Sequence, residues 1–163
     1  MAQCPDLGDE NAILALAFLD IDGVLNTERL RGRYGSDYLC TARVDRVNEL
    51  CEKSGASIVL TTTWAEHGRY EQTVKALRAV GLTAHVEGVV DYQIKSDDDL
   101  SDRSTQILSY VKRRESNTLG KVNYVVLDDL LLQGVPLVHI DDQWGILETD
   151  IDRAVKVLTA SNE

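Results

Sequence analysis

The sequence predicts an α/β fold, a three-layer Rossmann-like domain in which helices cover both faces of a parallel five-stranded sheet. Five short apolar runs, rich in β-branched residues, alternate with segments in which apolar residues recur at helical spacing. Such alternation is typical of strands joined by right-handed helical crossovers. Three of the five runs also end in acidic or hydroxyl residues, as expected where ligands bind beyond the carboxyl ends of parallel strands.

Each element is predicted from an apolar pattern and its flanking turn or capping residues. The strands are expected at residues 12–19, 57–60, 85–90, 123–127 and 136–140. The helices are expected from a Thr41 cap to a stop at 53–55, over about 70–80, from a Ser101 or Asp102 cap to about Arg114, and from an Asp150 cap through Leu158. Segment 26–39 is expected to be a loop, because its two glycines and scattered charges oppose a long regular helix. Segment 91–101 is expected to be an acidic loop.

Length and composition limit the possible classes of protein. At 163 residues the chain is expected to hold a single domain, residues 12–163, after a flexible N-terminal tail, residues 1–11. The net charge of −10 opposes non-specific binding to nucleic acid. The three cysteines lack metal-ligand spacing and favour a reducing compartment, so a cytoplasmic location is expected. Neither a secretory signal nor a membrane-spanning stretch is evident, and no membrane partner is predicted.

The first strand leads into two carboxylates, Asp20 and Asp22, followed by Gly23. Residues i and i+2 of a strand point the same way, so the two side chains would face one place. Two like charges at that distance need a cation, or one group must keep its proton through a raised pKa. The alternative is a polar strand exit with two solvated carboxylates.

Polar residues after two further strands would complete a site. Thr61 and Thr62 follow the second strand, and Asp128 and Asp129 follow the fourth. If the first and fourth strands are neighbours, their carboxylates converge on one point. Hard oxygen ligands favour Mg²⁺ over Zn²⁺. Hydroxyl and backbone N–H groups can bind phosphate oxygens, so this set meets the needs of phosphoryl transfer.

These motifs give the chain a resemblance to a known family. The stretches LDIDGV at 19–24, VLT at 59–61 and VLDD at 126–129, with a basic residue before a helix, look like the haloacid dehalogenase (HAD) superfamily. The chain is most similar to short, nearly capless members such as the HAD domains of RNA-repair-like proteins. The resemblance spans roughly residues 13–158. The expected strand order is 5-4-1-2-3, with a minimal cap on a single catalytic domain.

The resemblance implies a role for each carboxylate. Asp20 would be the nucleophile that forms an aspartyl-phosphate. Asp22 would be the general acid and base, and its backbone carbonyl would also bind Mg²⁺. Asp128 and Asp129 would complete the metal site, one as a direct ligand and one behind it. The expected metal site therefore comprises Asp20, Asp22, Asp128 and Asp129.

The resemblance also implies a set of phosphate-binding residues. Thr61 would bind the phosphate, with Thr62 next in order. Arg103, at the start of a helix before the fourth strand, is the expected basic residue, and Lys95 is its rival. Most family members use lysine here, but a guanidinium can bind phosphate through two parallel hydrogen bonds.

Local basic charge follows the nucleophile strand. The segment contains Arg29, Arg31 and Arg33, with Tyr34 and Tyr38 nearby, so its local charge is opposite in sign to the net charge of the chain. They are either a solvated loop or a basic lip for a phosphorylated or polyanionic substrate.

The sequence therefore predicts a Mg²⁺-dependent phosphatase acting through an aspartyl-phosphate. Short insertions imply an open site, which suits a phosphate on a macromolecule, with nucleic acid expected only as a substrate end. The alternative is a non-catalytic module of the same fold that binds Mg²⁺ or a phosphorylated partner.

Overall fold

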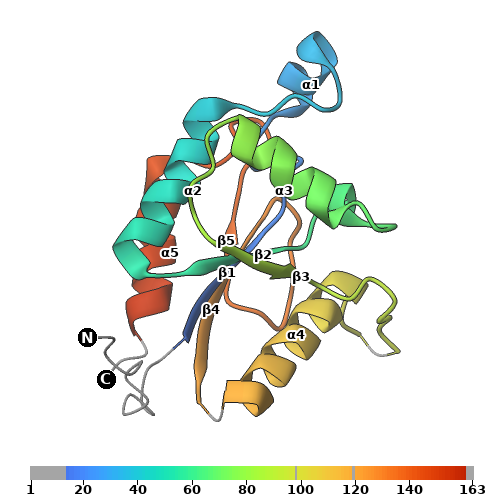
Figure 1. Ribbon diagram of the computed structural model, residues 1–163, viewed down its shortest axis with the longest axis vertical. Coiled ribbons are helices and arrows are strands. Elements are labelled where there is room, and N and C mark those ends of the chain that lie inside the picture. Colours follow the sequence, from blue (N-terminus) through green and yellow to red (C-terminus); the bar gives the residue numbers. More distant parts are fainter. Residues whose placement is uncertain (1–13, 98, 119, 161–163) are drawn as a thin grey trace, which may run out of the picture.

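A five-stranded, all-parallel sheet forms the centre of the molecule, with helices on both faces (Figure 1). The computed structural model describes residues 14–97, 99–118 and 120–160. The strands are β1 Leu14–Leu19, β2 Ser57–Leu60, β3 Val86–Val89, β4 Val122–Asp128 and β5 Leu137–His139. The helices are α1 Glu28–Tyr34, α2 Thr41–Ser54, α3 Tyr70–Ala79, α4 Asp102–Thr118 and α5 Glu148–Thr159, with a short 3-10 turn η1 at Thr63–Ala65. The strand order β3-β2-β1-β4-β5 confirms the predicted fold and order.

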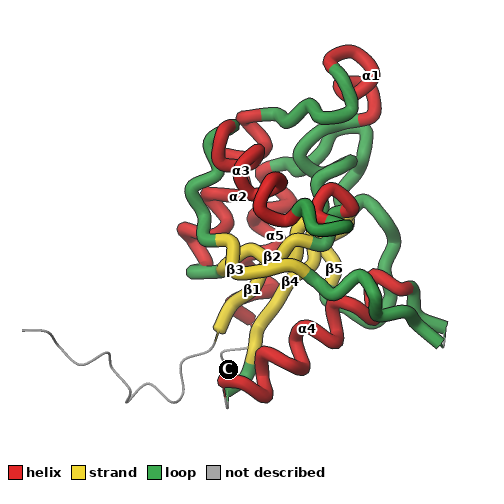
Figure 2. The backbone as a smooth tube through the Cα atoms, turned by 45° about the vertical axis from the view of Figure 1, so that its right-hand side comes forward, coloured by secondary structure: helices red, strands yellow, loops and turns green. Residues whose placement is uncertain are grey.

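Alternate residues of the central strand β1 face two separate cores. Ala17 and Leu19 point into the core that contains α2, α3 and α5, whereas Leu16 and Phe18 point toward α4. Figure 2 shows the sheet between these two layers. Because β1 is buried on both sides, its sequence is apolar throughout rather than alternating, as expected for a parallel strand.

The pairing register places three of the predicted site residues at one level of the sheet. Leu19 of β1 pairs with Leu60 of β2 on one side and with Leu127 of β4 on the other. The residues that follow these three are Asp20, Thr61 and Asp128. The backbone N–H of Asp20 continues the ladder by donating to the carbonyl of Leu127 at 3.1 Å. Residues far apart in the sequence therefore meet at the carboxyl edge.

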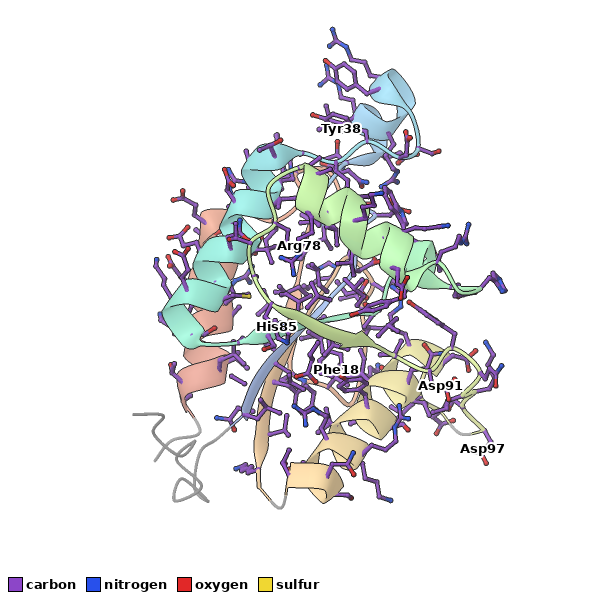
Figure 3. All side chains as sticks on the ribbon, viewed as in Figure 1. Phe18, Tyr38, Arg78, His85, Asp91 and Asp97 are labelled. Carbon is purple, nitrogen blue, oxygen red and sulfur yellow. The ribbon has the colours of Figure 1, made fainter. Side chains whose placement is uncertain are left out.

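Aromatic packing attaches α4 to the sheet. The Phe18 ring is fully buried and meets the rings of Tyr110 and Tyr124 edge-on, each at 5.7 Å between centroids (Figure 3). Edge-to-face pairs of this kind add to the stabilisation from buried area alone. Tyr110 belongs to α4, so this contact helps to fix the helix whose first turn carries Arg103.

The prediction that segment 26–39 forms a loop was wrong in part, because residues 28–34 form α1. The Thr27 hydroxyl accepts from the backbone N–H of Leu30 at 3.1 Å and caps the helix. Gly35, at φ 111°, ends it after seven residues. The glycine and the charges limited the length of the helix but did not prevent it. In Figures 1 and 2, α1 projects from the body of the molecule.

The predicted helix starts differ from the observed ones in two cases. Thr41 is the first residue of α2 rather than its cap, since Cys40 takes the cap position. Asp150 lies three residues beyond the Leu147 cap of α5, where its carboxylate accepts from the Leu147 N–H at 2.8 Å. An acceptor at that position satisfies a free helix N–H as a capping side chain would, so the local sequence signal was ambiguous.

The start of α4 agrees with the predicted cap. The Ser101 hydroxyl accepts from the Ser104 N–H at 3.1 Å, and the helix extends past Arg114 to Thr118.

None of the described helices is both long enough and apolar enough to cross a membrane. The predicted N-terminal tail, residues 1–11, lies outside the described residues.

Candidate active site

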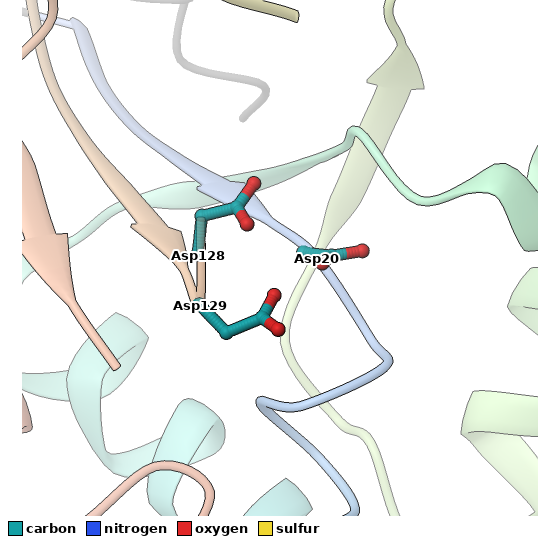
Figure 4. A group of neighbouring side chains, drawn as sticks. All are labelled: Asp20, Asp128 and Asp129. Carbon is teal, nitrogen blue, oxygen red and sulfur yellow. The ribbon is translucent and has the colours of Figure 1, made fainter. Parts of the chain in front are cut away.

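Three carboxylates converge at the ends of β1 and β4. Asp20, Asp128 and Asp129 each offer an oxygen within 4.8 Å of the others (Figure 4). Asp20 is 5% exposed and Asp128 is fully buried, while Asp129 is half-buried. The convergence expected from adjacent first and fourth strands is therefore present in the structure.

Burial and mutual repulsion disfavour the ionised form of this cluster. Burial, and then the nearby Asp128 carboxylate, raise the pKa of Asp20 to about 8, against the opposing effect of Arg103. Burial and Asp128 also raise the pKa of Asp129. A single guanidinium therefore does not offset the acidic charge. A divalent cation that prefers hard oxygen ligands, such as Mg²⁺, fits this donor set.

Arg103 lies against the carboxylates, whereas Lys95 does not. Arg103 Nη1 is 2.9 Å from Asp128 Oδ2 and 3.3 Å from Asp20 Oδ2, and its side chain is 18% exposed. Lys95 is 66% exposed and pairs with Asp102 at 3.8 Å. The structure thus brings only the first of the two rival basic residues to the cluster. A role for Arg103 in binding phosphate stays a prediction.

The two threonines after β2 differ in their environment. The Thr61 hydroxyl is buried and has no hydrogen-bond partner among the residues that the structure describes. The Thr62 hydroxyl instead accepts from the Trp64 N–H at 3.2 Å, and the Thr62 carbonyl accepts from the Tyr92 hydroxyl. A buried hydroxyl without a hydrogen-bond partner is energetically costly. This favours Thr61 over Thr62 as the threonine that would bind a ligand oxygen.

The Asp22 carboxylate is not a member of the carboxylate cluster. Its Oδ1 accepts from Trp64 Nε1 and from Asn26 Nδ2, each at 3.1 Å, and Arg31 Nη1 lies 3.7 Å away. The Asp22 side chain is 43% exposed. A role for Asp22 in the metal site, through its backbone carbonyl, stays a prediction.

Sequence reasoning did not single out Asn26, which the structure places beside Asp22. Asn26 is fully buried, accepts from the Gly23 N–H at 3.0 Å and from Arg31 Nη1 at 2.6 Å, and donates to the Tyr38 carbonyl at 3.1 Å. It therefore ties the loop after β1 to α1 and to Asp22. The available signal was a single amide directly after the apolar pair Val24 and Leu25.

Gly23 allows the loop after β1 to approach the Asp129 carboxylate, which follows β4. Its φ of 83° lies in the left-handed region, and a Cβ atom there would stand 2.6 Å from Asp129 Cγ. A residue with a side chain would be strained and would displace the Asp129 carboxylate. The glycine after the Asp-x-Asp motif is therefore required by the geometry of the cluster.

The expected basic lip is divided in the structure. Arg29 and Arg33 are exposed on α1, and the Arg33 guanidinium lies 5.3 Å from the centre of the Tyr34 ring. The Tyr34 and Tyr38 rings are 4.9 Å apart. Arg31 turns inward to Asn26 and Asp22, so it belongs to the site rather than to the outer surface.

The fold and the site together define a domain of the haloacid dehalogenase class. The family described as "HAD domain in Swiss Army Knife RNA repair proteins" matches residues 16–151. The chain belongs to this family, which confirms the resemblance seen in its motifs. Comparison with curated proteins and with solved structures found no match. Membership places the chain in a hydrolase superfamily.

Proposed function

We propose that the chain is a Mg²⁺-dependent phosphatase that hydrolyses phosphomonoesters through an aspartyl-phosphate on Asp20. The supporting observation is the convergence of three carboxylates within 4.8 Å beside the unpartnered hydroxyl of Thr61. Acidic groups, a buried hydroxyl and a guanidinium are what a phosphoryl-transfer site needs for positioning and charge neutralisation.

Asp20, Asp128 and Asp129 would hold the Mg²⁺ ion, with the backbone carbonyl of Asp22. When bound, the ion neutralises charge on the phosphate and on the carboxylates. The raised pKa values of Asp20 and Asp129 support this assignment, because burial first, and then the neighbouring Asp128 carboxylate, disfavour ionised acids that a bound cation would stabilise.

In the first step, an Asp20 carboxylate oxygen attacks phosphorus, and the bond from phosphorus to the alcohol oxygen breaks. Asp22 gives its proton to the departing oxygen, so the alcohol leaves neutral. Arg103 and the Thr61 hydroxyl bind the remaining phosphate oxygens. The product is an acyl phosphate on Asp20.

In the second step, Asp22 takes a proton from water as the water oxygen attacks the same phosphorus. The bond between phosphorus and the Asp20 oxygen breaks, which releases inorganic phosphate and restores the Asp20 carboxylate. Asp22 suits both steps because its Oδ1 is anchored, while its Oδ2 has no hydrogen-bond partner among the described side chains and backbone groups.

Removing one anchor should impair the proton transfer. For Trp64→Phe we expect kcat for an alkyl phosphate to fall about tenfold, a fraction of the total contribution of a general acid. An aryl phosphate, whose leaving group needs little protonation, should be affected less. Steady-state kinetics on both substrates measure this difference. Trp144→Phe is the control, because Trp144 is an exposed tryptophan that makes no hydrogen bond to Asp22. Equal losses on both substrates would contradict the anchoring role.

The substrate is proposed to be a phosphorylated macromolecule, and the end of a nucleic-acid strand is favoured. The description of the family names RNA repair proteins. The basic side chains of Arg29 and Arg33 on α1 are exposed, although the chain as a whole has a net charge of −10. A cytoplasmic location stays a prediction from the composition.

The role of the exposed arginines can be tested by substrate comparison. The double change Arg29→Ala and Arg33→Ala should raise KM for a phosphorylated oligonucleotide about tenfold or more, because each side chain offers charge to a polyanion. KM for an aryl phosphate should change little. The ratio of the two KM values at fixed ionic strength is the measurement. An equal change for both substrates would exclude a basic lip.

The activity itself is tested with purified protein and an aryl phosphate. Phosphate release should require Mg²⁺, stop on chelation and return when Mg²⁺ is restored. Binding of Mg²⁺, measured by calorimetry, without release of phosphate from any of a broad set of phosphoesters would instead favour the non-catalytic module.

A further inference from the structure

One cavity at the carboxyl edge of the sheet is bordered by Asp22. It has a volume of about 320 Å³, and it is lined by Asp22, Ser36, Asp37, Thr63, Trp64 and Arg69. A larger cavity of about 550 Å³, between Arg29 and Trp144, has none of the four catalytic-type aspartates in its lining. A third cavity, of about 440 Å³, has Asp129 in its lining but not Asp22. Of these three cavities, the one of about 320 Å³ is therefore the one bordered by the proposed general acid.

The reaction requires the departing alcohol to lie beside Asp22. A general acid must come within hydrogen-bond reach of the oxygen that it protonates. Trp64 and Asn26 donate hydrogen bonds to one carboxylate oxygen of Asp22. The Asp22 side chain remains 43% exposed to solvent. The alcohol part of the substrate thus has its place in the cavity that Asp22 lines.

The lining of this cavity indicates what kind of alcohol it accepts. Arg69 is exposed, and its Nε donates to the Glu66 carbonyl at 3.0 Å. Within the described ranges no carboxylate lies within ion-pair distance of Arg69. The Nη groups thus remain available for an anion. The Asp37 carboxylate and the Ser36 and Thr63 hydroxyls offer acceptors for sugar hydroxyl groups.

We propose that this cavity binds the alcohol part of the substrate and that Arg69 binds a second phosphate group on it. The substrate class is then a phosphomonoester whose sugar carries a further phosphodiester, as at the end of a nucleic-acid strand. This inference rests on the proposed function, since it places the alcohol by the role of Asp22. Arg69 is a specificity residue, because it contacts a part of the substrate that does not react.

Dinucleotides with a terminal phosphate, compared with the corresponding nucleoside monophosphates, test the role of Arg69. The two kinds of substrate differ by one nucleoside unit and its internal phosphodiester. Arg69→Ala should raise KM for the dinucleotide about tenfold, the loss expected for one charge-assisted hydrogen bond. KM for the monophosphate should stay near the wild-type value. Substrates phosphorylated at the 3′ and at the 5′ end are both used, and selectivity in either pair supports the proposal.

Arg113→Ala is the matched control, because Arg113 is an exposed arginine of α4, on the other face of the sheet. Arg69→Lys, which keeps the charge, should recover part of the dinucleotide preference. Equal effects of the Arg69 and Arg113 changes, or no selectivity in either substrate pair, would overturn the inference.

Binding separates this inference from the proposed activity. In an Asp20→Asn background with Mg²⁺ present, calorimetry gives Kd for the dinucleotide and the monophosphate with and without Arg69→Ala. A selective loss of dinucleotide binding upholds the Arg69 contact even if the wild-type protein releases no phosphate. Unchanged dinucleotide binding in the Arg69 variant overturns it, even if the phosphatase activity is found.

Discussion

Asp20→Asn is expected to reduce phosphate release by at least about 10³-fold, as loss of a covalent nucleophile does in other enzymes. An amide of the same shape occupies the position but cannot attack phosphorus. Asp45→Asn is the matched control, because Asp45 is an exposed carboxylate on α2. The measurement is kcat/KM for an aryl phosphate in saturating Mg²⁺. Turnover near the wild-type rate would refute the nucleophile assignment.

The same substitution should stabilise the metal-free protein at alkaline pH. The pKa of Asp20 is raised to about 8 in the folded protein from an ordinary value near 3.8. Between these two values the unfolded chain has lost this proton while the folded chain keeps it, so stability falls as pH rises through that interval. Asp20→Asn removes this dependence. Its melting temperature should exceed that of the wild type by several degrees at pH 8 to 9, since about 1 kcal/mol corresponds to roughly 2–4 °C in a domain of this size.

Thermal unfolding in a chelator at pH 5 and at pH 9 measures this effect. The gap between the variant and the wild type should widen with pH. Mg²⁺ should close the gap, because an ion that binds only the folded state stabilises it. A gap that is constant with pH would mean that Asp20 is already ionised in the folded, metal-free protein.

Arg103→Ala should cause the largest loss of stability among these substitutions. Arg103 Nη1 contacts both Asp20 and Asp128, and these carboxylates are 5% and 0% exposed. Removing the cationic partner of the buried Asp128 carboxylate costs about 3–5 kcal/mol, because that carboxylate then stays desolvated and unpaired. The proposed phosphate contact would be lost as well, so KM should also rise. Denaturant unfolding in chelator gives the stability difference.

Lys95→Ala is the matched control for this variant, since Lys95 was the rival basic residue. Lys95 pairs with Asp102 at the surface, where such pairs contribute about 0–1 kcal/mol. For the Lys95→Ala variant, both the free energy of unfolding and KM should stay near the wild-type values. A rise in KM from Lys95→Ala that exceeds that from Arg103→Ala would reverse the assignment of the basic residue.

The sequence was sufficient to predict the fold and the meeting of the carboxylates, for a physical reason. Parallel strands of similar length end at one edge, so a polar residue after each apolar run reaches that edge. Asp20 and Asp128 follow the paired residues Leu19 and Leu127, and the pairing needs only that β1 and β4 are neighbours. Periodicity therefore predicts the strands, whereas the order that makes β1 and β4 neighbours was expected from the family resemblance.

The contacts of Asp22 could not be predicted in the same way. Trp64 lies 42 residues from Asp22 in the sequence, and their hydrogen bond depends on how η1 packs against the loop after β1. Arg31 looked like one of three surface arginines, yet the α1 backbone turns it to Asn26. Arg103 was preferred to Lys95 because it lies at the start of a predicted helix, but its distances to Asp20 and Asp128 depend on how α4 packs against the sheet.

Trapping the phosphorylated enzyme tests the central claim most directly. Asp22→Asn should permit attack on an aryl phosphate, whose leaving group needs little protonation, but should slow the hydrolysis that depends on Asp22 as a base. After rapid quenching, mass spectrometry of the intact protein should show the added mass of one phosphoryl group, and peptide mapping should place that group on Asp20. Release of phosphate by the wild-type protein with no phosphoryl group on the trapped variant, or with that group on another residue, would contradict the account.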